Sequence, residues 1–152
     1  MQEMKYVTVD WDPEYSGFNI NPAPYLEALP DLLTSLPPGA RGFASEETHY
    51  SFSSLRCVKD LQLAEITTPV NKGDALSIRF APNEWKHEEG LLIRYFGVTR
   101  FQLDFKREAD WMSDEAVLID EILPRDGGCS HEIELTDSRI HVDCEDLTAI
   151  WG

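Results

Sequence analysis

The strongest structural signal in the chain is Cys129-Ser-His-Glu-Ile-Glu-Leu-Thr-Asp-Ser-Arg-Ile-His-Val-Asp-Cys144. Apolar and polar side chains alternate on both sides of Asp137-Ser138, which is typical of strands that bury one face only. One face would carry Ile133, Leu135, Ile140 and Val142, and the other Glu132, Glu134, His141 and Asp143. The stretch therefore predicts an antiparallel hairpin with a two-residue turn at Asp137-Ser138, one buried face and one acidic, solvent-exposed face.

Short strands separated by turns are predicted over most of the chain. Alternating or aromatic residues indicate them at residues 5–9, 50–52, 58–67, 76–80, 91–98, 101–105 and 117–123, and residues 146–151 are expected to extend the last strand of the hairpin. Gly97 predicts a bend between two of these strands. The pattern has no long helices of the kind that connect parallel strands, so we expect a mainly antiparallel sheet.

Prolines interrupt residues 13–45, and each one removes a backbone N–H donor and restricts the residue before it. Leucines still recur there at helical spacing, which predicts two short helices, Pro24–Leu29 and Asp31–Leu36. Pro37-Pro38-Gly39 is expected to end this unit. We therefore predict a single domain, residues 1–152, of the α+β class, with a mainly antiparallel, strongly curved sheet or sandwich and short N-terminal helices.

The charge of the chain is strongly negative and unevenly distributed. It has 28 acidic and 13 basic side chains, a formal net charge of −15. Residues 102–152 contain 14 acidic and 4 basic side chains, a net charge of −10. Such a surface repels nucleic-acid phosphates and anionic lipids, and it attracts a basic protein partner. The alternative is that the acidity only keeps the protein soluble.

The expected location is the cytoplasm. The sequence contains no run of about 18 apolar residues, which a membrane-spanning helix would need. Its first residues lack the basic and then apolar pattern of a secretory signal. Three sparse cysteines argue against a disulfide framework and for a reducing compartment.

Cys129, His131 and Cys144 are the candidate ligands for a metal. The expected turn places His131 opposite Cys144, with Cys129 further along the same face, so these three side chains could bind zinc. The same residues could form a Cys–His hydrolase site, with Glu132 or Asp146 orienting the histidine. Against both, the cysteines lie within strands, where small apolar core residues are common and backbone amides for an oxyanion are not.

The acidic face and the tryptophans are the candidate partner-binding features. The expected register places Glu134 opposite His141, and Glu132 opposite Asp143, where two carboxylates would repel each other unless a cation lies between them. All four tryptophans, Trp11, Trp85, Trp111 and Trp151, lie near charged residues, and acid-flanked aromatic residues commonly anchor basic partners. The expected contact residues are Glu132, Glu134, His141, Asp143, Glu145, Asp146, Trp151 and Trp111.

Several phrases of the sequence follow a layout found in a type of small bacterial protein. They are Arg56-Cys-Val-Lys-Asp-Leu61, Leu76-Ser-Ile-Arg-Phe80, Leu92-Ile-Arg-Tyr-Phe-Gly-Val98, Cys129-Ser-His-Glu-Ile-Glu-Leu135 and Ile140-His-Val-Asp-Cys-Glu-Asp-Leu147. Over about residues 50–150 this layout resembles small bacterial proteins, some of which are grouped with immunity proteins of polymorphic-toxin systems. The resemblance implies an acidic, cytoplasmic, non-enzymatic protein that occludes a cognate toxin. It transfers no site residue.

The leading hypothesis is therefore a non-enzymatic acidic binding protein without a cofactor, acting as a monomer or dimer. Its most specific form is an immunity-type inhibitor that occludes a basic toxin domain. A second hypothesis is a small-molecule carrier or sensor with a cavity between sheet and helices. A third is a zinc-dependent or Cys–His hydrolase.

Overall fold

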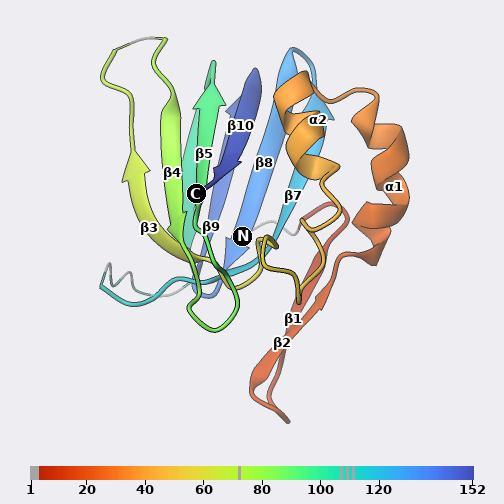
Figure 1. The fold of residues 1–152 in the computed structure, drawn as a ribbon, viewed down its shortest axis with the longest axis vertical. Helices are drawn as coiled ribbons and strands as arrows, with labels where there is room; N and C mark the ends of the chain where they lie inside the picture. Colours follow the sequence, from red (N-terminus) through yellow and green to blue (C-terminus); the bar gives the residue numbers. More distant parts are fainter. Residues whose placement is uncertain (1–3, 72, 107, 109, 111) are drawn as a thin grey trace.

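The computed structural model describes residues 4–71, 73–106, 108, 110 and 112–152, which form three antiparallel sheets and two helices (Figure 1). The elements, in chain order, are β1 (Thr8–Asp12), β2 (Gly17–Asn21), α1 (Ala23–Leu33), α2 (Pro38–Ala44), β3 (Gln62–Thr67), β4 (Leu76–Ala81), β5 (Leu91–Phe96), β6 (Arg100–Phe105), β7 (Val117–Arg125), β8 (Gly128–Leu135), β9 (Ser138–Cys144) and β10 (Asp146–Trp151). The first sheet has the strand order β10-β5-β4-β3, and the second sheet has the order β6-β9-β8-β7. Strands β1 and β2 pair only with each other.

The two four-stranded sheets bury their inner faces in one hydrophobic core. The first sheet contributes alternate residues such as Ile78 on β4 and Ile93 on β5, both almost fully buried. The second contributes the apolar side chains that alternation predicted for the closing hairpin, Ile133, Leu135, Ile140 and Val142. The α+β prediction is confirmed, and two sheets with a shared core correspond to its sandwich form.

Two bent strand pairs connect the sheets at one corner. The chain passes from β5 into β6 at Gly97, where φ is +62°, as the predicted bend requires. It passes from β9 into β10 through Glu145, so residues 146–151 form a strand of the other sheet. At the corner, Thr99 N–H donates to Asp143 O at 2.9 Å, and Glu145 N–H donates to Phe96 O at 2.9 Å.

The helices differ from the prediction in number of turns and in position. One helix, α1, continues through Pro30, because the buried ring of Tyr25 anchors it and donates from its hydroxyl to Ile122 O at 2.7 Å. The second helix, α2, begins at Pro38, where the sequence predicted an end, since a first-turn proline loses no helical hydrogen bond. Among the described residues, neither helix is long and apolar enough to cross a membrane.

The N-terminal region contains an additional strand and projects from the body of the protein. Strand β1 begins at Thr8 rather than at Lys5, and β2 was not predicted. Together they form a hairpin that extends away from the two large sheets (Figure 1). Residues 50–52, predicted as a strand, lie in a loop instead.

Candidate protein-binding surface

The hairpin of β8 and β9 has a different register from the predicted one. Its two-residue turn is Thr136-Asp137, so Glu134 lies opposite Arg139, and Glu132 lies opposite His141. The predicted pairs Glu134–His141 and Glu132–Asp143 are therefore wrong. Because each partner moved by two positions, every side chain still lies on the predicted face.

The outer face of this hairpin is a charge-compensated surface, and the prediction of an exposed acidic face is wrong. Glu134 is 2% exposed and pairs with Lys106 and with Arg139, whose Nε lies 2.6 Å from Oε2. Asp143 is 7% exposed and pairs with Arg125. Arg139 within the hairpin, together with Lys106 and Arg125 from outside it, thus neutralises two of the acids that were expected to meet a partner.

His141 lies between Glu132, the third acid of this face, and Asp143. Its Nδ1 lies 3.3 Å from Glu132 Oε1, and its Nε2 lies 2.8 Å from Asp143 Oδ1. The hydrogen bond with Glu132, and to a smaller extent that with Asp143, raises the pKa of His141 above its ordinary value. When it is protonated, His141 therefore supplies the positive charge between these two acids that the sequence suggested a partner would supply.

The other predicted contact residues have varied environments. Asp146 accepts hydrogen bonds from the backbone N–H groups of Gly39 at 3.0 Å and Ala40 at 2.9 Å, so it caps the first turn of α2. Glu145 is exposed. Trp151 is half-buried and stacks on His87 with ring centroids 6.3 Å apart. Trp111 lies outside the described residues.

The three candidate metal ligands do not converge on a common point. Cys129 and Cys144 face each other with their sulfur atoms 3.7 Å apart, and both are buried. His131 lies opposite Val142 rather than Cys144, and both of its ring nitrogens are engaged, by Tyr95 and by Asp120, each at 2.7 Å. Within the described part of the chain, no group of three His, Cys, Asp or Glu side chains is arranged to hold a metal ion.

A buried polar network takes the place of this expected site. Asp120, on β7, accepts hydrogen bonds from His131 Nε2 at 2.7 Å and from His49 Nε2 at 2.7 Å. The other nitrogen of His49, Nδ1, lies 2.9 Å from Phe43 O, just before the end of α2. All three residues are at most 1% exposed. The network therefore fastens the loop after α2 to the second sheet, and no substrate reaches it from solvent.

The geometry specifies which histidine carries the charge. Both nitrogens of His49 face acceptors that have no proton to give, a carbonyl and a carboxylate, so His49 is an imidazolium. Burial alone would lower the pKa of His49, but the charge of Asp120 and the hydrogen bonds to Asp120 and Phe43 raise it. Burial would likewise raise the pKa of Asp120, and the charge of His49 and the hydrogen bonds of both histidines hold it well below its ordinary value. The Tyr95 hydroxyl oxygen lies 2.7 Å from Nδ1 of the other histidine, His131.

The projecting hairpin of β1 and β2 presents aromatic and acidic side chains to solvent. Val9 and Ile20 pack on the core near its base, and Trp11 and Phe18 lie further out on the same face, with ring centroids 5.1 Å apart. Trp11 and Tyr15 are each 55% exposed. Asp10, Asp12 and Glu14 belong to the same hairpin and, among the described residues, form no ion pair with a lysine or arginine.

Local chemistry makes this hairpin rigid at both ends. At the tip, Asp12 Oδ1 accepts from Glu14 N–H at 2.9 Å, and the Tyr15 hydroxyl donates to Asn19 Oδ1 at 2.7 Å. The Tyr15 ring lies so close to Gly17 that a Cβ there would be 2.3 Å from it. At the base, the buried carboxylate of Glu121 accepts from the N–H groups of three consecutive residues, 5–7, at 2.7–3.1 Å.

Of these hairpin residues, only Trp11 was among the partner-binding features predicted from the sequence. A usable signal was present, because no lysine or arginine occurs between Lys5 and Arg41, whereas five acids do. The predicted contact set came instead from the most acidic third of the chain. There the nearby basic residues are fewer than the acids, but they pair with the acids that lie on the sheet.

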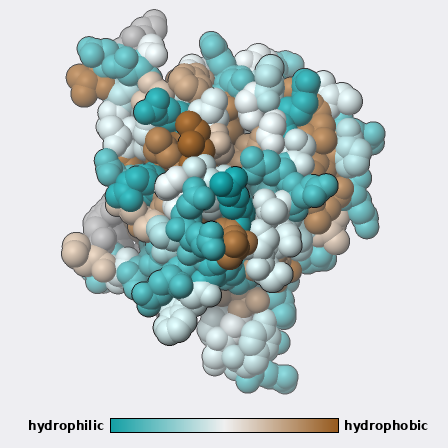
Figure 2. Space-filling model, viewed as in Figure 1, coloured by the Kyte–Doolittle hydropathy of each residue, from teal (hydrophilic) through white to brown (hydrophobic). Residues whose placement is uncertain are grey.

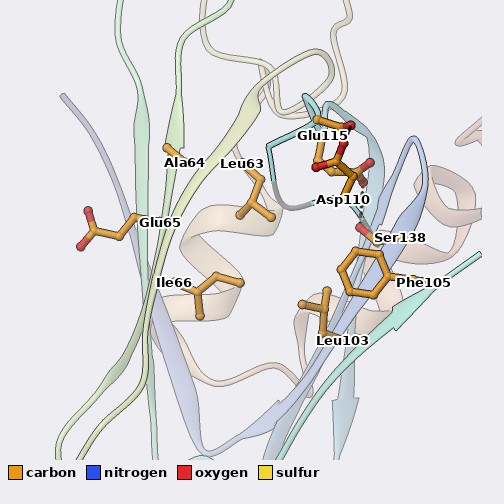
Figure 3. A pocket seen from close by; sticks show the side chains of 10 residues that line it. Leu63, Ala64, Glu65, Ile66, Leu103, Phe105, Asp110, Glu115 and Ser138 are labelled. Atoms are coloured by element: carbon orange, nitrogen blue, oxygen red, sulfur yellow. Dashed lines mark hydrogen bonds between the residues drawn. The ribbon is translucent and has the colours of Figure 1, made fainter. Parts of the chain in front are cut away.

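Two hollows bear on the carrier hypothesis. The enclosed space beside Asp120 and His131 measures about 10 Å³, enough for about one water molecule. A larger hollow of about 300 Å³ lies between β3 and β6, lined by Leu63 and Ile66 on one side and by Leu103 and Phe105 on the other (Figure 3). It lies between two edge strands rather than between sheet and helices, and its volume is at the lower limit for small-molecule sites.

On the face of the molecule that Figure 2 shows, hydrophilic side chains predominate and hydrophobic ones form small separate groups.

Comparison with known proteins gives no match. No protein-family model matches the chain, no curated protein matches it, and no solved structure matches it.

Proposed function

We propose that the protein is a non-enzymatic binding protein that docks a basic protein partner through the β1–β2 hairpin. The observation that supports this most directly is the composition and exposure of residues 8–21. They contain three acids, no base, and two aromatic rings that are each 55% exposed on a rigid projection. Aromatic rings supply desolvated contact area, and unpaired carboxylates supply steering and register toward a cationic surface.

The specific form of this proposal is an immunity-type inhibitor that occludes a basic toxin domain. It rests on the acidic net charge of −15 and on the resemblance in layout of about residues 50–150 to such bacterial proteins. Its distinguishing test is genetic. A neighbouring reading frame should encode a protein with a basic toxin domain, and co-expression with this chain should restore growth to cells that produce that domain.

The binding proposal is tested by removing only the charge of the hairpin. The variant Asp10→Asn/Asp12→Asn/Glu14→Gln keeps the size of all three side chains. This variant should associate with the partner recovered from the source organism at least tenfold more slowly at low salt than the original protein does. Its association rate should also depend less on ionic strength, and stopped-flow measurements determine both.

A matched control neutralises three acids elsewhere, Glu27→Gln/Asp31→Asn/Glu47→Gln. All three are exposed and, among the described residues, unpaired with a lysine or arginine. This control should lower the association rate by less than threefold. Equal effects of the two triple variants would mean that net charge alone drives association, and the hairpin proposal would then be rejected.

A small-molecule carrier is a second candidate, favoured by the 300 Å³ hollow between β3 and β6. Its walls are apolar, while Asp110 and Glu115 lie at one end, so an apolar amine would match it better than an anion (Figure 3). Native mass spectrometry of the protein purified from its source would reveal a bound molecule that Leu103→Trp, a substitution that fills the hollow, displaces.

A further inference from the structure

The loop between β4 and β5 displays a tryptophan that the fold does not use. Trp85 is 90% exposed, although a buried indole is among the largest apolar contributions to stability. Leaving such a ring in water stabilises nothing in the folded chain. Its flanking residues Glu84 and Glu88 are also exposed, and neither forms an ion pair with another described residue.

The loop that carries Trp85 is held in one conformation by its own side chains. Asn83 Oδ1 accepts from Trp85 N–H at 3.0 Å. His87 accepts from Asn83 N–H at its Nδ1, at 3.1 Å, and donates from its Nε2 to Cys57 O at 2.9 Å. These roles require the neutral ring, and burial lowers the pKa of His87, which favours that form.

A lysine fastens the same loop to a neighbouring segment of the chain. Lys86 Nζ lies 2.8 Å from Asp60 Oδ2 and donates to Lys59 O at 3.3 Å. Residues on both sides of Trp85 are therefore fixed, and the indole is held outward by a rigid support. Ordering a flexible loop opposes binding, because the loop loses conformational entropy. This loop is already ordered in the free protein, so that cost is reduced.

A hollow beside the loop completes a contact surface. It measures about 370 Å³ and is lined by Thr48, Ser54, Leu55, Arg56, Glu88 and Glu89. Leu55 is half exposed within it. Arg56 is already paired with Glu89 at 3.3 Å, so the remaining charge of the hollow is that of Glu88. The surface combines an apolar projection, an apolar depression and negative charge.

We propose that Trp85 is a preformed anchor for a second contact with the same basic partner. The indole inserts into an apolar pocket of that protein, and lysine or arginine side chains at the pocket rim pair with Glu84 and Glu88. This inference rests on the proposed function for the class of partner, but it concerns a different surface. The β1–β2 hairpin and the β4–β5 loop both lie toward the lower end of the molecule in the view of Figure 1, and the proposal requires that one partner reaches both.

The test uses the photoreactive residue p-benzoylphenylalanine at three positions in the full chain, Tyr15 in the hairpin, Trp85 in the loop, and Val70 as an exposed control. Each variant is irradiated in a lysate of the source organism, and the adducts are identified by mass spectrometry. We expect the positions 15 and 85 to capture the same polypeptide, with a pI above about 9, and position 70 to capture none.

A binding measurement with the purified captured protein completes the test. Trp85→Ala should weaken its affinity at least tenfold, Trp85→Phe should weaken it less, and Val70→Ala should leave it within twofold. The exposed position of residue 85 means that these substitutions leave folding intact, which the thermal midpoint verifies.

Each other outcome has a separate meaning. Capture at position 15 without capture at 85, or an affinity of Trp85→Ala within twofold of the original, overturns this inference and leaves the proposed function standing. Capture at neither position overturns both. A second copy of this chain captured at position 85, or equal capture at position 70, also overturns the inference, because the loop would then serve self-association or unspecific contact.

Discussion

His49 and Asp120 form an ion pair inside the protein, with Nε2 of the imidazolium 2.7 Å from Oδ1 of the carboxylate and both side chains almost fully enclosed. The pair joins the loop that follows α2 to β7, two parts of the chain that are distant in sequence. It is stabilised by Phe43 O on one side and by His131 on the other. The ion pair stabilises the fold only when both members are present, because either one alone would be an uncompensated buried charge.

Replacing Asp120 by Asn should therefore destabilise the fold strongly. The substitution keeps the shape but removes the charge that His49 faces, and breaking a buried pair costs about 3–5 kcal/mol. Urea unfolding followed by circular dichroism measures the change. Asp31→Asn, an exposed control, should stay within about 0.5 kcal/mol of the original protein. A small effect of Asp120→Asn would contradict the assignment of His49 as an imidazolium.

The same pair predicts how stability changes with pH. The pKa of His49 is raised in the folded protein, so its contribution is fully present below the unfolded value of about 6.5 and is lost as pH rises through the folded value. The difference in unfolding free energy between the original protein and His49→Gln should shrink over that alkaline range. A difference that stayed constant from pH 6 to pH 9 would contradict a raised pKa of His49, because the folded and unfolded states would then lose its proton over the same pH range.

Asp120 governs the acid side. Its pKa is held below the ordinary value by His49 and His131, so its contribution is present above about pH 4 and is lost as pH falls through the folded value. Acid unfolding of the original protein should be steeper than that of Asp120→Asn. Titration by circular dichroism between pH 5 and pH 2 compares the two.

Asp146 should contribute to stability through α2 rather than to partner binding. Its two carboxylate oxygens accept the N–H groups of Gly39 and Ala40, and loss of a helix cap costs about 1–2 kcal/mol. Asp146→Ala should lower the unfolding free energy by that amount, while Glu145→Gln, next to it but exposed, should not. The partner's association rate should be the same for Asp146→Ala as for the original protein.

Arg139→Ala tests the charge-compensated face of the β8–β9 hairpin. Glu134 would keep Lys106 but lose the 2.6 Å contact with Arg139, and a weakened buried charge costs about 1–3 kcal/mol. The effect should appear in urea unfolding. Arg79→Ala, whose pair with Glu65 is exposed, is the control and should change stability by less than about 1 kcal/mol.

Alternation of side chains predicted the faces of β8 and β9 correctly but not their register. A turn at Thr136-Asp137 and one at Asp137-Ser138 bury the same apolar residues, so the hydrophobic pattern cannot distinguish them. The choice changed the partner of Glu134 from His141 to Arg139, and with it the electrostatic character of the face. The error in the predicted contact surface has two causes. One is the position of this turn, and the other is that Lys106 and Arg125 pair with Glu134 and Asp143, which no local sequence pattern predicts.

The helices illustrate a second limit. Leucine spacing predicted helical structure around Tyr25 and Leu29, and both are buried on α1. The predicted helix ends at Pro30 and Pro38 were wrong. The sequence does not show that Tyr25 anchors α1, which continues through Pro30, or that Asp146 caps α2. Each compensation comes from a residue far away in the chain, and such contacts exist only once the sheets have formed.

The corner where β5 continues into β6 and β9 into β10 has a consequence for how the protein opens. Each of these strand pairs belongs to both sheets, and the hydrogen bonds of Thr99 and Glu145 lie at the crossing. Neither sheet can detach as a separate unit without breaking the bend that it has in common with the other. The two sheets therefore open together, and the amide protons at the centres of both should report one common free energy of opening.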